Sequence, residues 1–263
     1  MKARFRIAQA GPHVSYQDAG RLNMARFGVT QAGPMDRLAH RAGFAALGQR
    51  PGTAIEVSLG GLRLECLEGS VSLAVTGGGF IVERERAYSS WQVLTISAGQ
   101  SLTIRRGPWG SWCYLAFAGD LISPRWLGSA ATQGATGLGG GKLVAGGEVL
   151  VTEARRDLPA RALPCPIFAR PRHQLGVTLG PQDRFFAPET LQSLLSQAFS
   201  LTDAYDRMGV RLSGPDLSPN VALTMPSEPI ARGALQVAGD GVATLLLADH
   251  QTTGGYPKIA TVL

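Results

Sequence analysis

Charged and aromatic residues are both scarce in this sequence of 263 residues, at 17% and 7%. A charge content that low, with 44% hydrophobic residues, excludes a disordered tail or a coiled coil and indicates a packed core. Nowhere does an apolar run reach about 18 residues, which excludes a membrane-spanning helix. The residues after the basic N-terminus do not sustain the apolar run of a signal peptide. We therefore expect a cytoplasmic protein with no membrane contact.

Cysteine and histidine are too sparse and too scattered to suggest a metal centre. The cysteines are Cys66, Cys113 and Cys165, and the four histidines have no close-spaced partners. Structural zinc ligands come in close-spaced pairs, and a disulfide framework uses an even number of cysteines. We expect no metal and three reduced thiols, and we place His40 on the surface of a helix.

Nucleotide-binding and hydrolase motifs are also missing. The glycine-rich stretch Gly134–Gly141 fails as a phosphate-binding loop, because Thr136 stands where that loop needs its first glycine and Leu143 follows Lys142. We interpret this stretch as a turn between strands. No GxGxxG and no GxSxG occurs, so neither a dinucleotide fold nor a nucleophile elbow is indicated. The chain holds no Met-Lys-Met and thus no recognisable biotinyl lysine of its own.

Lysine is nearly absent, so the net charge of +6 comes from arginine. The arginines are scattered, and their densest groups are pairs without interleaved aromatic residues. Nucleic-acid surfaces cluster their charge on one face, so we do not expect nucleic-acid binding. An anionic small molecule or an acidic partner surface explains the surplus better.

Short apolar stretches bounded by glycine, proline or polar clusters dominate the chain, which has 34 Gly and 16 Pro. Their length and their spacing of about ten residues are typical of an all-β sandwich or barrel. The strands expected in the first half are Ala54–Leu59, Leu62–Cys66, Val71–Thr76, Val93–Ile96, Ser101–Ile104, Trp112–Phe117 and Val149–Thr152. Those expected in the second half are Gln174–Leu179, Met208–Leu212, Ala234–Val237, Ala243–Ala248 and Ile259–Leu263.

Two segments have helical patterns instead. Met35–Leu47 is rich in helix formers and is followed by Gly48, and Pro188–Gln197 begins with the Pro-Glu that a helix N-terminus favours. In the first helix we expect Met35, Leu38, Ala39, Ala42, Ala45 and Ala46 to share the apolar face. The fold class is therefore mainly β with a few helices.

Residues 155–172 carry a concentration of proline and arginine that favours an extended linker. The expected organisation is an N-terminal lobe of residues 1–154, this linker, and a C-terminal lobe of residues 173–263.

Four polar clusters beside glycine could carry chemistry, because backbone amides approach a ligand most easily there. They are Gln17–Arg21, Gly33–Arg37, Asp206–Gly209 and Asp249–Pro257. The last follows an apolar run and suits an anion held by backbone N–H groups, with an ordinary glycine-rich hairpin as the alternative. Asp36 has an alternative role in capping its helix, with Arg37 solvated.

At these residues the sequence resembles the carboxyltransferase-domain family known as allophanate hydrolase subunit 2, whose bacterial members include the C-type subunit of the ATP-hydrolysing 5-oxoprolinase. The similar motifs are YQDAGR at 16–21, GPMDR at 33–37, IEVSLGG at 55–61, LAVTGG at 73–78, YLAFAGD at 114–120, GPQDRF at 180–185, DRMGVRLSG at 206–214 and ADHQTTGGYPKIATV at 248–262. They are collinear over almost the whole chain, and the last is the most specific.

The resemblance implies two lobes related to cyclophilin-like β-barrels. It also implies a subunit-1-type carboxyltransferase partner and a third, lactam-utilisation subunit, which together open the lactam of 5-oxoproline to glutamate at the expense of ATP. ATP is then bound at the complex rather than necessarily at this chain. In urea carboxylase the similar domain transfers carboxylate from biotin to urea, and this is the alternative function. A third hypothesis is a non-catalytic binding or regulatory subunit.

Loop chemistry and the resemblance together nominate site residues. Asp36 and Asp206 are candidate acid/base or orienting groups, and the arginines are candidate anion clamps. The catalytic candidates are Asp36, Arg37, Glu56, Asp206 and Arg207. The substrate-binding candidates are Gln17, Arg21, Asp249, Gln251, Thr252, Thr253, Tyr256 and Lys258. We expect loops of both lobes to converge on one pocket for a negatively charged small molecule.

The chain departs from the family pattern at several positions. The family usually has Ala at Pro34, Asn at Gln49, Gly at Asp120 and an arginine at Ala130, and the last change could remove an anion contact. Family members usually continue for another strand-bearing stretch after the position of Leu263. The resemblance thus implies either that a partner completes the second lobe or that the chain is a divergent member.

Overall fold

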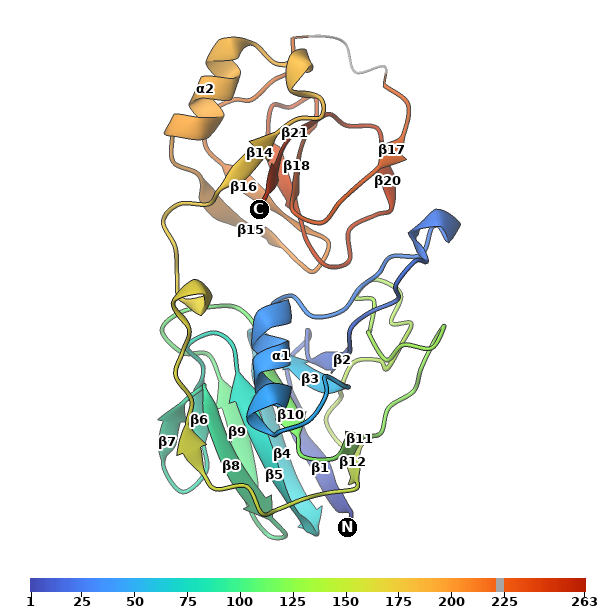
Figure 1. The fold of residues 1–263 in the computed structure, drawn as a ribbon, viewed down its shortest axis with the longest axis vertical. Helices are drawn as coiled ribbons and strands as arrows, with labels where there is room; N and C mark the ends of the chain where they lie inside the picture. The colour runs from blue at the N-terminus through green and yellow to red at the C-terminus, as the bar shows by residue number, and fades with distance from the viewer. Residues whose placement is uncertain (221–224) are drawn as a thin grey trace. The chain divides into compact units, whose positions relative to one another are not determined.

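The computed structural model describes residues 1–220 and 225–263, and the chain forms two compact units (Figure 1). Unit 1 comprises Met1–Arg21 and Gly33–Pro171, and unit 2 comprises Leu22–Ala32 and Arg172–Leu263. The expected class, mainly β with a few helices, is confirmed. Within the described residues no helix is long and apolar enough to cross a membrane.

Unit 1 is built on two antiparallel sheets (Figure 1). One has seven strands in the order β11 (Asp120–Leu121), β12 (Glu148–Thr152), β1 (Ala3–Ala10), β4 (Leu62–Glu68), β9 (Ser101–Arg105), β6 (Ile81–Glu83) and β7 (Ala87–Ser89). The other has six, in the order β13 (Arg161–Ala162), β8 (Gln92–Ser97), β5 (Ser70–Thr76), β10 (Cys113–Phe117), β3 (Ala54–Val57) and β2 (Ser15–Gln17).

The two sheets of unit 1 share one apolar core. Along β1, buried and exposed residues alternate, so that Phe5 and Ile7 point inward and Arg4 and Arg6 face solvent. Phe5 meets Phe117 of the other sheet with ring centroids 5.5 Å apart. The strands β5 and β10 are buried along most of their length because a helix covers their other face.

Helix α1 (Arg37–Ala46) lies against β5 and β10 (Figure 1). Thr76 Oγ1 donates a hydrogen bond of 2.7 Å to the carbonyl of Ala39, and a Cβ on Gly43 would lie 2.9 Å from that hydroxyl. The helix is rotated from the expected orientation, since Leu38 is 53% exposed. The placement of His40 on the helix surface was wrong: it is 2% exposed and lies on the same face as Phe44, one turn away.

Unit 2 has a six-stranded antiparallel sheet in the order β14 (Val177–Leu179), β21 (Lys258–Val262), β18 (Ala234–Val237), β19 (Ala243–Leu246), β16 (Gly209–Ser213) and β15 (Ser200–Tyr205). A two-stranded ribbon pairs β17 (Glu228–Pro229) with β20 (Thr253–Gly254). Helix α2 (Pro188–Ser196) contributes Leu191 and Leu194 to a core that centres on Leu235 and Ile259.

Three short 3-10 helices complete the described elements: η1 (Ala25–Phe27), η2 (Ile167–Ala169) and η3 (Asp183–Phe185). Of residues 155–172, expected as a linker, 155–171 belong to unit 1 and include β13, which pairs with the outer side of β8. The three cysteines are free thiols. Because the strand orders describe open sheets, the barrel form and the likeness to cyclophilin stay predictions.

Candidate functional site

A cavity of about 400 Å³ in unit 2, here called the unit 2 pocket, brings together three of the residues nominated from the sequence. Its lining includes Asp206, Gln251 and Tyr256 together with Arg211 and Gln236. These side chains come from the turn after β15, from β16 and β18, and from the loop between β19 and β21. The pocket thus combines a carboxylate, two carboxamides, a guanidinium and a phenol.

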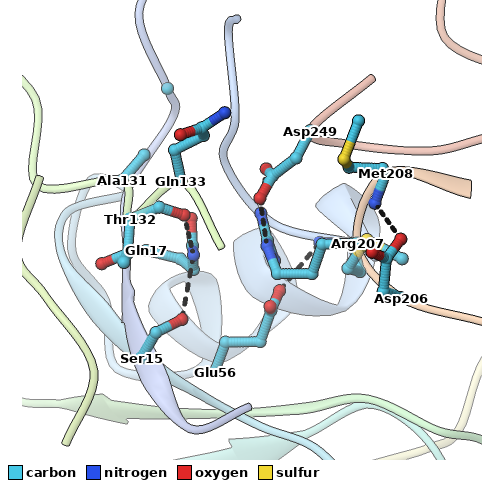
Figure 2. Close-up of polar contacts among 12 residues, drawn as sticks. Ser15, Gln17, Glu56, Ala131, Thr132, Gln133, Asp206, Arg207, Met208 and Asp249 are labelled. Carbon is cyan, nitrogen blue, oxygen red and sulfur yellow. Dashed lines mark hydrogen bonds and ion pairs between the residues drawn. The ribbon is translucent and has the colours of Figure 1, made fainter. Parts of the chain in front are cut away.

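Asp206 holds the turn between β15 and β16. Its Oδ1 accepts the N–H group of Met208 at 2.7 Å (Figure 2). The same oxygen accepts the N–H group of Gly209 at 3.1 Å. A carboxylate that accepts the N–H two residues ahead closes an Asx turn, which explains why Asp stands here. Because the turn uses Oδ1, the orientation of the carboxylate is fixed at the edge of the unit 2 pocket.

Gln236 is a candidate binding residue that sequence reasoning missed. It lies on β18, is 4% exposed, and its Oε1 accepts a 3.3 Å hydrogen bond from Gln251 Nε2. No described residue accepts a hydrogen bond from Gln236 Nε2. A buried amide donor without a partner costs free energy, so it is a candidate for binding a ligand acceptor. The available signal was a glutamine inside the otherwise apolar strand Ala234–Val237.

Gly254 lies directly beside this pair of amides. A Cβ added to Gly254 would be 2.8 Å from Gln236 Nε2 and 2.7 Å from Ile230 Cδ1. The neighbouring Gly255 has more room, since its nearest contact would be the Met225 carbonyl at 3.5 Å. Of the two glycines, Gly254 is therefore the one at which an added Cβ would displace the ends of the Gln236 and Ile230 side chains.

Arg207 forms a buried ion pair with Asp249 (Figure 2). Their side chains are 4% and 1% exposed, and two guanidinium nitrogens donate to the two carboxylate oxygens, at 3.0 and 2.8 Å. The bidentate geometry suits arginine alone among cationic side chains. In unit 2 the pair connects the turn after β15 to the start of the loop that carries Gln251.

Lys258 is also paired with neighbouring residues. Its Nζ lies 3.1 Å from Glu228 Oε2, and its backbone N–H donates to Gln182 Oε1 at 3.0 Å. Thr252 accepts a backbone hydrogen bond from Ile230, and Thr253 belongs to β20. These contacts make this part of the loop a short ribbon next to the unit 2 pocket.

In unit 1, the nominated Glu56 and Asp36 are connected through Tyr114. The Tyr114 hydroxyl donates to Glu56 Oε2 at 2.8 Å and accepts the Asp36 N–H at 2.7 Å. The Met35 N–H also donates to Glu56 Oε2, at 2.8 Å. Glu56 is fully buried, and burial followed by the charge of Glu56 raises the pKa of Tyr114 well above its ordinary value. The phenol therefore stays protonated as a donor.

Asp36 also caps helix α1, because its Oδ1 accepts the N–H groups of Leu38 and Ala39 at 3.0 and 2.9 Å. Arg37 is exposed at the first position of the helix. These are the roles that the alternative interpretation of this cluster gave to the two residues.

Gln17 and Arg21 support a loop of unit 1. Gln17 Nε2 donates to Ser15 Oγ and to the Thr132 carbonyl, both at 3.0 Å (Figure 2). The Arg21 guanidinium lies 4.8 Å from the centre of the Trp126 ring, and its Nη2 donates to the Ala131 carbonyl. Both side chains hold the segment between β11 and β12.

His40 lies edge-on to Tyr114, with ring centroids 5.6 Å apart. Burial lowers the pKa of His40 to about 4, against the carbonyls of Gln17 and Gly52, which raise it. The ring is thus neutral near pH 7.

The pocket expected between loops of both lobes stays a prediction.

Comparison with known proteins gives related families. The sequence profile described as "Carboxyltransferase domain, subdomain A and B" matches residues 27–263. The C-type subunit of the 5-oxoprolinase of Haemophilus influenzae is 33% identical over 98% of this chain and 84% of its own length. A urea amidolyase of Saccharomyces cerevisiae is 29% identical over 97% of this chain and 15% of its own length. The solved structure of TTHA0988 matches 99% of this chain with a TM-score of 0.85 and 30% identity. This chain spans about half, 51%, of the length of TTHA0988.

Proposed function

The chain belongs to the carboxyltransferase-domain family with subdomains A and B, and from this membership we propose that it is the C-type subunit of a 5-oxoprolinase. The observation that carries the proposal is the 33% identity to such a subunit over 98% of the chain. A match of that extent includes both units rather than one shared domain. The protein then acts in a complex with a subunit-1-type partner and a lactam-utilisation subunit.

The reaction we propose is the ATP-dependent opening of 5-oxoproline to glutamate. A five-membered lactam is a resonance-stabilised amide. Transfer of a phosphoryl group from ATP to its carbonyl oxygen makes that oxygen part of a leaving group. Water then adds to the carbon, the C–N bond breaks and the nitrogen takes a proton, which leaves an acyl phosphate. A second water hydrolyses the acyl phosphate to the carboxylate of glutamate and free phosphate. ATP binds within the complex, and the cytoplasm is the compartment that supplies it.

The unit 2 pocket supports this proposal by the kinds of groups it holds. The carboxamides of Gln236 and Gln251 can donate to a lactam carbonyl and accept from its N–H. The guanidinium of Arg211, which also pairs with Asp240, offers attraction to a substrate carboxylate, and the carboxylate of Asp206 lines the pocket as a candidate acid/base or orienting group. In this proposal Arg207 acts as a positioning residue, since its guanidinium holds Asp249.

Co-expression tests the proposal. The chain, a subunit-1-type partner and a lactam-utilisation subunit are purified together and assayed for glutamate released from 5-oxoproline with and without ATP. The proposal expects ATP-dependent glutamate production that requires this chain and falls with Asp206→Asn. Full turnover by the other two subunits without this chain would reject it, and so would tight binding of 5-oxoproline by the complex without any product.

A second candidate function is transfer of a carboxyl group from carboxybiotin to a urea-like acceptor. The similarity to a urea amidolyase over 97% of this chain favours it. The chain has no Met-Lys-Met, so a separate carrier would have to supply the carboxybiotin. Consumption of carboxybiotin on addition of urea, without ATP-dependent glutamate production, would select this function over the first.

A further inference from the structure

A polar cavity of about 370 Å³ lies in unit 1 between the loop that follows α1 and the segment that follows β10. Arg50 and Thr53 line one side, and Asp120, Ser123 and Arg125 line the other. It shares no residue with the unit 2 pocket, and none of the residues nominated from the sequence lines it. The function proposed above therefore assigns no role to this cavity.

Two hydroxyl groups in the wall of this cavity lack hydrogen-bond partners. Thr53 is 7% exposed, and within residues 1–220 and 225–263 neither its Oγ1 nor the buried Oγ of Ser123 contacts a donor or an acceptor. Buried hydroxyls are normally paired, and an unpaired one costs free energy. Both oxygens are shielded from solvent, so each hydroxyl reaches an acceptor in the cavity when its side chain rotates about the Cα–Cβ bond.

The loop that carries Thr53 is tied to the rest of unit 1 by hydrogen bonds. Gln49 Nε2 donates to the Phe117 carbonyl at 2.9 Å, and Arg155 Nη2 donates to Gln49 Oε1 at 3.2 Å and to the Leu47 carbonyl at 2.9 Å. The negative end of helix α1 is thereby paired with a cation, so it does not repel an anion from the cavity. The loop after α1 is thus tied to β10 through Gln49 and to Arg155.

The charges that line the cavity favour an anion. Arg50 has no ion pair or side-chain hydrogen bond with any residue that the structure describes, so its guanidinium is available. The side chain of Arg125 is 55% exposed, and its Nη1 lies 3.4 Å from Asp18 Oδ2. Against these two cations stands one lining carboxylate, that of Asp120. Arginine is well suited to binding an oxyanion through parallel N–H donors.

We propose that this cavity binds a small oxyanion, either a carboxylate or a phosphate group. Arg50 supplies the opposite charge, and the hydroxyls of Thr53 and Ser123 supply two neutral donors. A rotation about the Cα–Cβ bond of Thr53 exchanges its methyl and hydroxyl groups and turns the hydroxyl toward the anion. The site does not depend on the function proposed for the unit 2 pocket.

Calorimetric titration of the full chain with inorganic phosphate, and separately with sodium acetate, tests the site. We expect saturable binding of at least one of the two anions, weakened about tenfold by Arg50→Gln. Arg106→Gln is the matched control, because Arg106 is likewise exposed and lies outside the cavity. Binding of phosphate alone identifies a phosphoryl ligand, and binding of acetate alone identifies a carboxylate.

Thr53→Val separates binding from folding. It keeps the shape of the side chain and removes an unpaired hydroxyl, so the melting temperature stays equal or rises while anion affinity falls several-fold. Three results would overturn the proposal: no saturable binding of either anion, equal weakening by Arg106→Gln, or unchanged affinity in both Arg50→Gln and Thr53→Val.

Discussion

Arg207 and Asp249 form a bidentate ion pair that is almost completely withdrawn from solvent, with nitrogen–oxygen distances of 3.0 and 2.8 Å. It joins the turn after β15 to the loop that carries Gln251, which lines the unit 2 pocket. The two residues were nominated as a catalytic and a substrate-binding residue, and in unit 2 they bind each other. The pair positions the loop because both partners come from segments that flank the pocket.

Asp249→Asn tests this structural role. The substitution removes the carboxylate from a buried bidentate ion pair, which we expect to lower the free energy of unfolding by about 3–5 kcal/mol. Denaturant unfolding of the purified chain measures the change. Asp240→Asn is the control, since it breaks the exposed Arg211–Asp240 pair and should change stability far less. Equal effects of the two substitutions would show that the buried pair does not hold the loop.

His40 predicts a dependence of stability on pH. Its pKa is about 4 in the folded chain and about 6.5 when unfolded, so the unfolded state binds more protons between these values. The contribution of neutral His40 to the free energy of unfolding is complete above pH 6.5 and is lost as the pH falls toward 4. The total loss over this range is about 3 kcal/mol. Unfolding of wild type and His40→Phe at pH 4.5, 5.5 and 7 should give a shallower decline for the variant. If the stability of wild type and variant declined in parallel, the lowered pKa of His40 would be contradicted.

Tyr114→Phe tests the buried network of Glu56 and Asp36. The change removes a donor to the Glu56 carboxylate and an acceptor for the Asp36 N–H, so it should cost about 1–3 kcal/mol of unfolding free energy. Thermal and denaturant unfolding measure it. Tyr88→Phe removes a hydroxyl that contacts the exposed Arg86, and it should have little effect. If both variants lose the same free energy of unfolding, the phenol of Tyr114 does not stabilise the buried Glu56.

Much of the fold could be predicted from the sequence because short apolar stretches between glycines mark strands reliably. Ala234–Val237 was predicted with its observed bounds, and the first helix was predicted to begin at Met35, two residues before it does. Asp36 explains the difference, since its side chain caps the helix. The rotation of that helix was not predictable from apolar residues alone, because a histidine is buried where leucine was expected.

The candidate site was only partly predictable for a related reason. Polar residues beside glycine identified Asp206, Gln251 and Tyr256, which line one cavity. The same pattern also marked Gln17 and Arg21, which hold a neighbouring loop of unit 1. Loop composition does not distinguish a side chain that binds a ligand from one that binds its own backbone. Gln236 was missed because the nominated residues came from polar loops beside glycine, whereas Gln236 lies within an apolar strand.

The central claim is that the unit 2 pocket holds the small amide beside Gln236 and Gln251, and two adjacent glycines test it most directly. A Cβ at Gly254 would press on Gln236 Nε2 and on Ile230, whereas one at Gly255 meets nothing closer than 3.5 Å. The measurement is the KM for 5-oxoproline of the complex reconstituted from all three proteins and carrying either alanine variant, with melting temperatures recorded for both. We predict a KM raised about tenfold or more by Gly254→Ala and little changed by Gly255→Ala. An unchanged KM for a folded Gly254→Ala complex would contradict the account.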